Sequence, residues 1–163
     1  METLNLWLAT GLGVGFIPFA PGTFGSLWGV VLAWWLGDKT PGRQGAIIAV
    51  LALLAVPVCH LASAEYFARG DAGSIVLDEI IAFPLALLGL VYRRGATALG
   101  QWPWLMVAFA LYRGLDALKP PPVSWAEAMP GGLGIVADDL VAAALAWLCM
   151  SVLLGAWRRY RHA

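Results

Sequence analysis

Three carboxylates and a hydroxyl stand within nine residues of a chain that otherwise carries few charges. They belong to Asp71, Ser74, Asp78 and Glu79, and an apolar run from Ile80 to Val91 follows directly. A carboxylate in a nonpolar setting is costly unless a metal ion, a cation or a helix N-terminus compensates its charge. One interpretation is that Asp78 and Glu79 simply lie in the first turn of a helix. That interpretation does not explain why charged residues recur in similar places elsewhere.

Further charged residues stand at the ends of other apolar segments. Arg113 and Asp116 are three residues apart and therefore share one helix face. Lys119 follows them, and Asp138 and Asp139 precede the last apolar run. If the helices cross a bilayer in alternation, all these groups lie on one side of it. Six of the ten acidic residues then gather there with two cations: Asp71, Asp78, Glu79, Asp116, Asp138 and Asp139, with Arg113 and Lys119.

Such a group of side chains suits metal-assisted chemistry on a phosphate. Carboxylate oxygens without nearby histidines are the ligands of Mg²⁺, Ca²⁺ or Mn²⁺ rather than of zinc. Arginine and lysine beside them suit phosphate oxygens. Because the setting is apolar, the sequence predicts metal-assisted phosphoryl chemistry on a lipid.

A glycine-rich turn precedes another helix, between Pro18 and Leu27. In one interpretation Thr23 is the N-cap of that helix and Ser26, three residues later, supports the cap. In the other, the backbone N–H groups and the hydroxyls at the helix start bind an anion such as phosphate. The local pattern favours neither.

Composition indicates a membrane protein. The chain has 163 residues, of which 61% are hydrophobic and 12% charged, and its mean hydropathy is +0.78, well outside the range of soluble domains. Its length predicts one domain, residues 1–163, and its net charge of zero argues against a nucleic-acid partner. Cys59 and Cys149 have the spacing of neither a disulfide framework nor a zinc site, so we expect small buried side chains distant from the acidic residues.

The apolar runs predict an all-α fold. We expect a compact polytopic membrane bundle of about four or five helices, with short or re-entrant segments and a polar site at the helix ends on one face. Residues 44–64, which carry no charge, form the best spanning candidate, with a kink at Pro57. Trp102, Trp104 and Tyr112 are typical of a membrane interface. The expected helices are 23–36, 44–64, 78–92, 102–119 and 138–157, after a short embedded or re-entrant segment at 4–19.

Four blocks of this sequence, taken together, resemble the phosphatidylglycerophosphatase A family. In the family's order they are Pro21–Ser26, Asp71–Glu79, Arg113–Pro120 and Gly131–Asp139. The resemblance implies a bacterial inner-membrane, multi-pass enzyme that removes the terminal phosphate of phosphatidylglycerophosphate with Mg²⁺ and yields phosphatidylglycerol. The sequence departs from the family at Ala82, where a glycine is usual, and at Pro121, where an aromatic residue is frequent. Neither position is a candidate ligand.

The resemblance also suggests roles for individual residues. Asp78, Glu79, Asp138 and Asp139 are expected to bind the metal or activate water, with Asp71 and Asp116 as further metal ligands. Arg113 and Lys119 are expected to hold the phosphate of the phospholipid substrate, aided by Thr23 and Ser26 at their helix start. Direct attack by water and an aspartyl-phosphate intermediate both remain open.

Three other functions are alternatives to this one: a histidine-dependent phosphatase, a small cation-coupled transporter or channel, and a non-catalytic relative. The first needs two catalytic histidines, whereas His60 lies in an apolar run and His162 at the C-terminus. The second favours charges spread through the span, and retention of the acidic and basic residues argues against the third. The site is expected on the cytoplasmic face, where the resemblance implies that the substrate is made. The positive-inside tendency points outward instead, because seven of the ten basic residues lie away from the site: Lys39, Arg43, Arg93, Arg94, Arg158, Arg159 and Arg161.

Overall fold

The computed structural model describes residues 2–65, 72–90 and 102–162, and every regular element within those ranges is a helix. The predicted all-α class is therefore confirmed for this part of the chain. Asp71, Arg69, Arg93 and Arg94 lie outside the described residues. The elements in chain order are α1 (Glu2–Ala9), η1 (Val14–Phe16), α2 (Pro21–Leu36), α3 (Pro41–Glu65), η2 (Ala72–Ser74), α4 (Leu77–Ala82), η3 (Phe83–Leu87), α5 (Trp102–Leu118), α6 (Val123–Glu127) and α7 (Gly132–His162).

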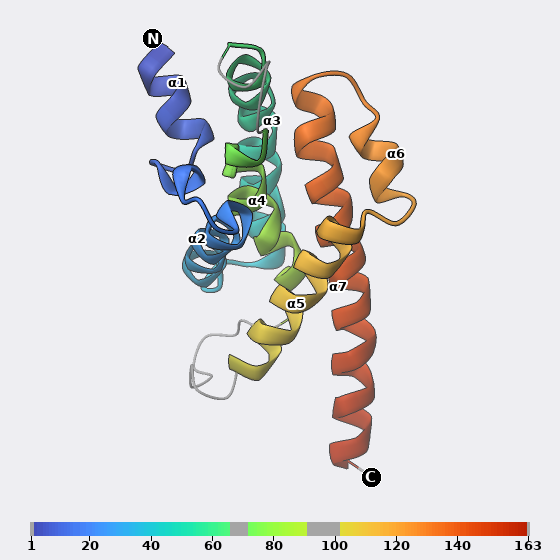
Figure 1. The fold of residues 1–163 in the computed structure, drawn as a ribbon. Coiled ribbons are helices and arrows are strands. Elements are labelled where there is room, and N and C mark those ends of the chain that lie inside the picture. Colours follow the sequence, from blue (N-terminus) through green and yellow to red (C-terminus); the bar gives the residue numbers. More distant parts are fainter. Residues whose placement is uncertain (1, 66–71, 91–101, 163) are drawn as a thin grey trace.

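The long helix α7 is the element against which most others pack (Figure 1). It contacts α3, α4, η3, α5 and α6, while α2 packs on the far side of α4 and η3. Three alanines on α7, Ala142, Ala143 and Ala146, are completely buried. Because the side chains of these alanines are small, η3 and α5 can pack closely against α7. Phe83 and Tyr112 fill the space between η3 and α5. The short helix α4 therefore lies between α2, α3 and α7.

The helix predicted for residues 78–92 is wrong in length. The α-helix ends at Ala82 after six residues, and a 3₁₀ segment continues from Phe83 to Leu87. Pro84 explains the change, because proline lacks the N–H that would continue the α-helical hydrogen bonds. A six-residue helix is about 9 Å long, so α4 does not cross a bilayer. The alternation of crossings assumed from the sequence fails at this segment.

The last helix begins earlier than predicted, at Gly132 instead of Asp138. The turn before it uses a positive φ of 59° at Gly131. A Cβ atom on Gly132 would lie 2.1 Å from the carbonyl oxygen of Val56, so only glycine allows α7 to start against α3. Asp138 and Asp139 consequently lie beyond the first turn of α7, and its N-terminus does not explain these carboxylates.

Two of the described helices, α3 and α7, are long and apolar enough to cross a membrane. The predicted span at 44–64 lies within α3, with Pro57 inside that helix. Both helices carry large apolar side chains on their outer surface, such as Leu53 at 73% exposure and Val152 at 71%. Cys149 is exposed on α7, so its predicted burial is wrong, whereas Cys59 is buried as predicted.

Candidate functional site

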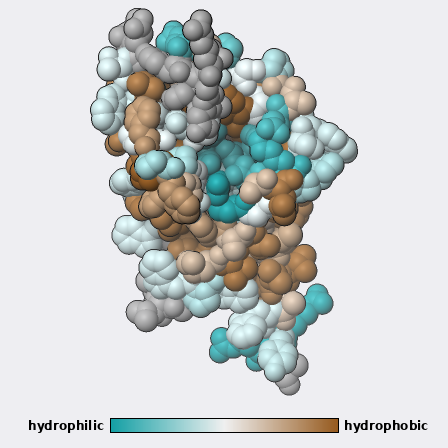
Figure 2. Space-filling view, viewed as in Figure 1, coloured by the Kyte–Doolittle hydropathy of each residue, from teal (hydrophilic) through white to brown (hydrophobic). Residues whose placement is uncertain are grey.

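Charged side chains gather where α4, α5 and α7 meet. Figure 2 shows a hydrophilic patch in the middle of one face, with hydrophobic surface around it. Both predicted cations and all the predicted acidic residues that the structure describes belong to this group, as their ion pairs and mutual electrostatic interactions show. They are Asp78, Glu79, Arg113, Asp116, Lys119, Asp138 and Asp139.

Glycines on α2 make room for Glu79. A Cβ atom on Gly22 would lie 2.1 Å from Oε1 of Glu79, and one on Gly25 would lie 3.1 Å from Oε2. The Ser26 hydroxyl, which is completely buried, lies 2.9 Å from the Gly22 carbonyl oxygen and 3.2 Å from Oε2 of Glu79. Ser26 therefore contacts a carboxylate of the site.

Thr23 is not the N-cap of α2. The helix begins at Pro21, Ala20 occupies the cap position with φ 48°, and no side chain caps the helix there. Proline is favoured in the first helical turn because its missing N–H has no intrahelical partner in any case. The capping interpretation is thus wrong for Thr23, which lies half-buried in the first turn.

Arg113 joins two carboxylates on different helices. Its Nη1 atom lies 2.9 Å from Oε1 of Glu79 on α4 and 2.6 Å from Oδ2 of Asp116 on its own helix, α5. The second contact matches the predicted shared helix face. The pKa of Glu79 is raised to about 7, chiefly by burial and also by the negative charge of Asp116, while Arg113 and Ser26 partly oppose the shift.

Lys119 makes a similar bridge on the other side of the site. Its Nζ atom lies 2.8 Å from Oδ2 of Asp138 and also pairs with Glu127 at the end of α6. Burial alone lowers the pKa of Lys119, but the hydrogen bonds to these two carboxylates outweigh it and raise the pKa above its usual value. Glu127 was not among the predicted site residues, because it stands in a short segment between prolines and glycines, away from the ends of the long apolar runs.

Asp78 and Asp139 form the buried centre of the group. Both are over 90% buried and repel each other, and neither has an ion-pair partner among the described residues. Oδ1 of Asp78 accepts a hydrogen bond from the Glu79 N–H at 2.9 Å. Burial and repulsion by Glu79 raise the pKa of Asp78 well above its usual range. Two buried carboxylates so placed require protons or a cation.

Tyr112 belongs to this centre rather than to a membrane interface. Its side chain is completely buried, and its ring meets that of Phe83 edge-on at 5.7 Å. Its hydroxyl donates a hydrogen bond to Oδ1 of Asp139 at 2.8 Å. The interfacial prediction for Tyr112 is therefore wrong. In the sequence, the one indication that Tyr112 belongs to the site was its position directly before Arg113.

Cys59 lies differently from the sequence prediction, whereas His60 lies within helix α3 as expected. The Cys59 thiol is buried within electrostatic range of Asp78 and Asp139, so the expectation that it is distant from the acidic residues is wrong. The Nδ1 atom of His60 accepts a hydrogen bond from the Gly132 N–H at 3.3 Å. This histidine joins α3 to the start of α7.

Comparison with known proteins identifies the family. The sequence model described as Phosphatidylglycerophosphatase A matches residues 7–154. The chain belongs to the phosphatidylglycerophosphatase A family. All four blocks noted in the sequence lie within the matched range. No solved structure matches the chain.

Curated relatives agree with this membership. The Phosphatidylglycerophosphatase A of Escherichia coli K12 is 34% identical over 146 residues, which cover 87% of this chain and 80% of the relative. That of Haemophilus influenzae is 37% identical over 138 residues, 83% of this chain and 80% of the relative. A Putative phosphatidylinositol-3-phosphatase of Bacteroides thetaiotaomicron is 30% identical over 155 residues, 91% of this chain and 92% of the relative.

The donor set of this phosphatidylglycerophosphatase A family member fits a hard divalent cation. Within the described ranges, no three carboxylate, imidazole or thiolate side chains form a ready-made cage for a metal ion. Mg²⁺ does not need one, because it usually binds one or two carboxylates and completes its shell with water and substrate phosphate. Asp78 and Asp139 are two buried carboxyl groups with no ion-pair partner among the described residues.

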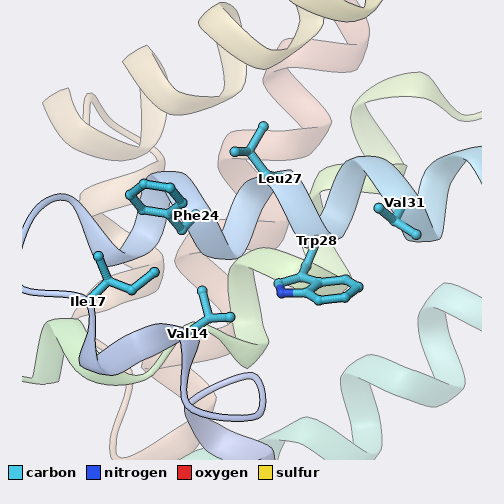
Figure 3. A pocket seen from close by; sticks show the side chains of 6 residues that line it. All are labelled: Val14, Ile17, Phe24, Leu27, Trp28 and Val31. Carbon is cyan, nitrogen blue, oxygen red and sulfur yellow. The ribbon is translucent and has the colours of Figure 1, made fainter.

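An apolar pocket of about 240 Å³ lies on another face of α2 (Figure 3). None of the predicted site residues lines it. Because its lining offers no charged group, it does not suit a phosphate. The lining residues are Val14, Ile17, Phe24, Leu27, Trp28 and Val31.

Proposed function

We propose that this chain hydrolyses the terminal phosphate monoester of phosphatidylglycerophosphate, giving phosphatidylglycerol and inorganic phosphate in phospholipid biosynthesis. One observation carries the proposal. In a chain of this family, buried carboxylates and two cations from separate segments meet in a single polar patch. The names of the Escherichia coli and Haemophilus influenzae relatives state the same activity.

The cofactor in this proposal is Mg²⁺. Asp78 and Asp139 are its central ligands, and Glu79 and Asp138 are adjacent carboxylates that bind it or activate water. Asp116 and Asp71 are the outer candidates. When bound, Mg²⁺ neutralises charge on the phosphate oxygens and lowers the pKa of coordinated water. The support for this choice is the oxygen-rich donor set and the burial of two carboxyl groups that have no ion-pair partner among the described residues.

The two cations hold the substrate phosphate. A guanidinium has five N–H donors, and only Nη1 of Arg113 is engaged by Glu79 and Asp116. The Nη2 atom lies beside the first turn of α2, 2.9 Å from the place where a Gly22 side chain would begin. Because of this proximity, we assign Thr23 and the backbone of that turn to the same phosphate as Arg113. Ser26 assists by orienting Glu79.

Two pathways for the displacement follow from these residues. In the first, a carboxylate takes a proton from water as the water attacks phosphorus, the bond from phosphorus to the lipid oxygen breaks, and the lipid alkoxide leaves and is protonated. In the second, a carboxylate oxygen of Asp78 or Asp139 attacks phosphorus, the lipid alkoxide leaves, and water then releases phosphate from the aspartyl-phosphate. Acid quenching with ³²P-labelled substrate distinguishes them, because only the second pathway leaves labelled protein.

We further propose that the chain is a multi-pass protein of the bacterial inner membrane, a bundle of about four or five helices with its site on the cytoplasmic face. The length and composition of α3 and α7 support membrane crossing. Single cysteines at Ala128 and Arg159, in a chain lacking Cys59 and Cys149, test the orientation. Both positions are exposed, near opposite ends of the molecule. An impermeant thiol reagent on intact cells should label the Arg159→Cys variant and spare Ala128→Cys; the reverse pattern would place the site outside.

The decisive experiment measures phosphate release in detergent micelles with and without Mg²⁺. Phosphatidylglycerophosphate, phosphatidic acid and phosphatidylinositol 3-phosphate are supplied separately, the last because of the name of the Bacteroides relative. Mg²⁺-dependent release from phosphatidylglycerophosphate above the others is expected. No release from any of the three by folded protein would remove the phosphatase proposal and favour a transporter or an inactive relative.

A further inference from the structure

Lys119 is held by two carboxylates that come from different elements. Asp138 lies on α7, and Glu127 is the last residue of α6. A lysine ammonium has three donor hydrogens and can rotate freely about its last bond. With two hydrogens engaged by these carboxylates, the direction of the third is fixed.

We propose that Glu127 is a positioning residue that orients Lys119, so that the third N–H of the ammonium points toward the phosphate of the substrate. The inference rests on the proposed phosphatase function and adds a residue to it. Glu127 itself does not touch the reacting atoms, since its side chain is half exposed and its partner is Lys119.

The backbone on both sides of the ion pair between Lys119 and Glu127 is held in place, so the position of the pair is set by more than the two side chains. Lys119 has a positive φ of 45° directly after α5, a conformation that L-residues adopt only where the surroundings impose it. On the other side, Val123 and Ala126 of α6 are buried and α6 packs along α7. This packing places Glu127, the only charged residue of the short helix α6, beside Lys119.

The arrangement on Arg113 has the same form, which argues for a shared purpose. There too a cation lies between two carboxylates of different helices, Glu79 and Asp116. An exposed ion pair contributes little to stability. The pair of Lys119 and Glu127 is therefore better explained by orientation than by folding energy.

Removing Glu127 should change substrate binding in opposite directions, depending on whether Glu127 orients Lys119 or only adds negative charge near the phosphate. If Glu127 only added negative charge near the phosphate, its removal would strengthen binding of phosphatidylglycerophosphate. If Glu127 orients Lys119, its removal weakens that binding, because the ammonium then samples directions that miss the phosphate. Loss of one oriented, charge-assisted hydrogen bond corresponds to about a tenfold change in affinity.

The test is a kinetic comparison of Glu127→Gln with the wild type and with Glu65→Gln, an exposed glutamate at the end of α3. We expect Glu127→Gln to raise KM for phosphatidylglycerophosphate and the Ki of inorganic phosphate about tenfold, with kcat within about twofold. Glu127→Asp, which keeps the charge on a shorter side chain, should recover most of the binding. Glu65→Gln should match the wild type.

A double-mutant cycle with Lys119→Met completes the test. If Glu127 acts through Lys119, the Glu127→Gln change has no further effect on KM in the Lys119→Met chain. An equal effect in both backgrounds, a lower KM in Glu127→Gln, or a fall in kcat with unchanged KM would overturn the inference. A wild-type chain that releases no phosphate would instead defeat the proposed function, so the two failures are distinguishable.

Discussion

Nη1 of Arg113 lies 2.9 Å from Oε1 of Glu79, although 34 residues separate them in the sequence and they stand on different helices. The space for this ion pair is provided by a third helix, α2, at Gly22. A Cβ atom there would lie 2.1 Å from Oε1 of Glu79 and 2.9 Å from Nη2 of Arg113. A methyl group at position 22 would therefore displace the ion pair of Glu79 and Arg113.

The first prediction follows for Gly22→Ala. We expect phosphate release to fall at least about tenfold, because displaced Glu79 and Arg113 no longer meet the substrate correctly. Gly45→Ala is the matched control: a Cβ on Gly45 meets nothing within 4 Å, and alanine is the better helix former. Equal activity of the two variants would show that the pair tolerates displacement.

The second prediction concerns Asp78→Asn. This change removes one charge from the buried pair and keeps the shape of the side chain. Turnover should fall by at least about 100-fold, as losses around metal sites commonly do, while the protein stays folded and inserted in the membrane. Activity and thermal unfolding in detergent measure the two effects, with exposed Asp38→Asn as control. Near-normal turnover would exclude Asp78 as a ligand, and loss of folding alone would favour a helix-capping role.

The third prediction isolates the hydroxyl of Tyr112. Tyr112→Phe keeps the ring against Phe83 and removes only the hydrogen bond to Asp139. We expect an intact fold and a three- to tenfold weaker apparent affinity for Mg²⁺, since one hydrogen bond to a charged group is lost. Calorimetric titration with Mg²⁺ gives that affinity independently of turnover. Unchanged affinity would show that Asp139 is held well enough by its other contacts.

The fourth prediction is a pH dependence of stability. Glu79 has a pKa raised from 4.5 to about 7, chiefly by burial, so the folded state holds its proton more tightly than the unfolded state does. Its contribution to stability is therefore fully present below about pH 4.5 and is lost as pH rises through 7. In metal-free protein the unfolding temperature should fall between pH 5.5 and 8.

Mg²⁺ should reverse that trend, because it binds carboxylates only when they are deprotonated. Addition of the metal should raise the unfolding temperature more at pH 8 than at pH 5.5. Glu79→Gln should flatten the metal-free profile. A stability that rises with pH in the absence of metal would contradict the assigned shift.

The grouping of charges was predictable from the sequence, since each member stood beside an apolar run where an isolated charge is costly. Asp78, Glu79, Arg113, Asp116, Lys119, Asp138 and Asp139 were all singled out, and the structure brings them together. Their chemical roles stay predictions. The helical class followed from the apolar runs and is confirmed for the described residues. The family was indicated by the resemblance of four sequence blocks and is also confirmed.

Residues whose role depends on packing were not predictable from local patterns. Tyr112 looked interfacial, because an aromatic residue in an apolar helix gives no sign of what its hydroxyl meets. Cys59 lies almost twenty residues before Asp78, and only the packing of α3 against α4 and α7 brings its thiol near the carboxylates. The early end of α4 was signalled by Pro84, but the apolar run to Val91 was read as one continuous helix.

The length of α7 has a consequence for where the reaction takes place in the membrane. Asp138 and Arg158 stand twenty residues apart on this helix, or about 30 Å at 1.5 Å per residue, which equals the thickness of a hydrocarbon core. In the proposed arrangement, the length of α7 sets the depth of the site in the membrane. Arg158 lies at one membrane–water boundary, and Asp138 therefore lies at the other. A lipid phosphate already resides at that depth. The substrate then arrives by sideways diffusion, and no work is needed to lift its tails out of the bilayer.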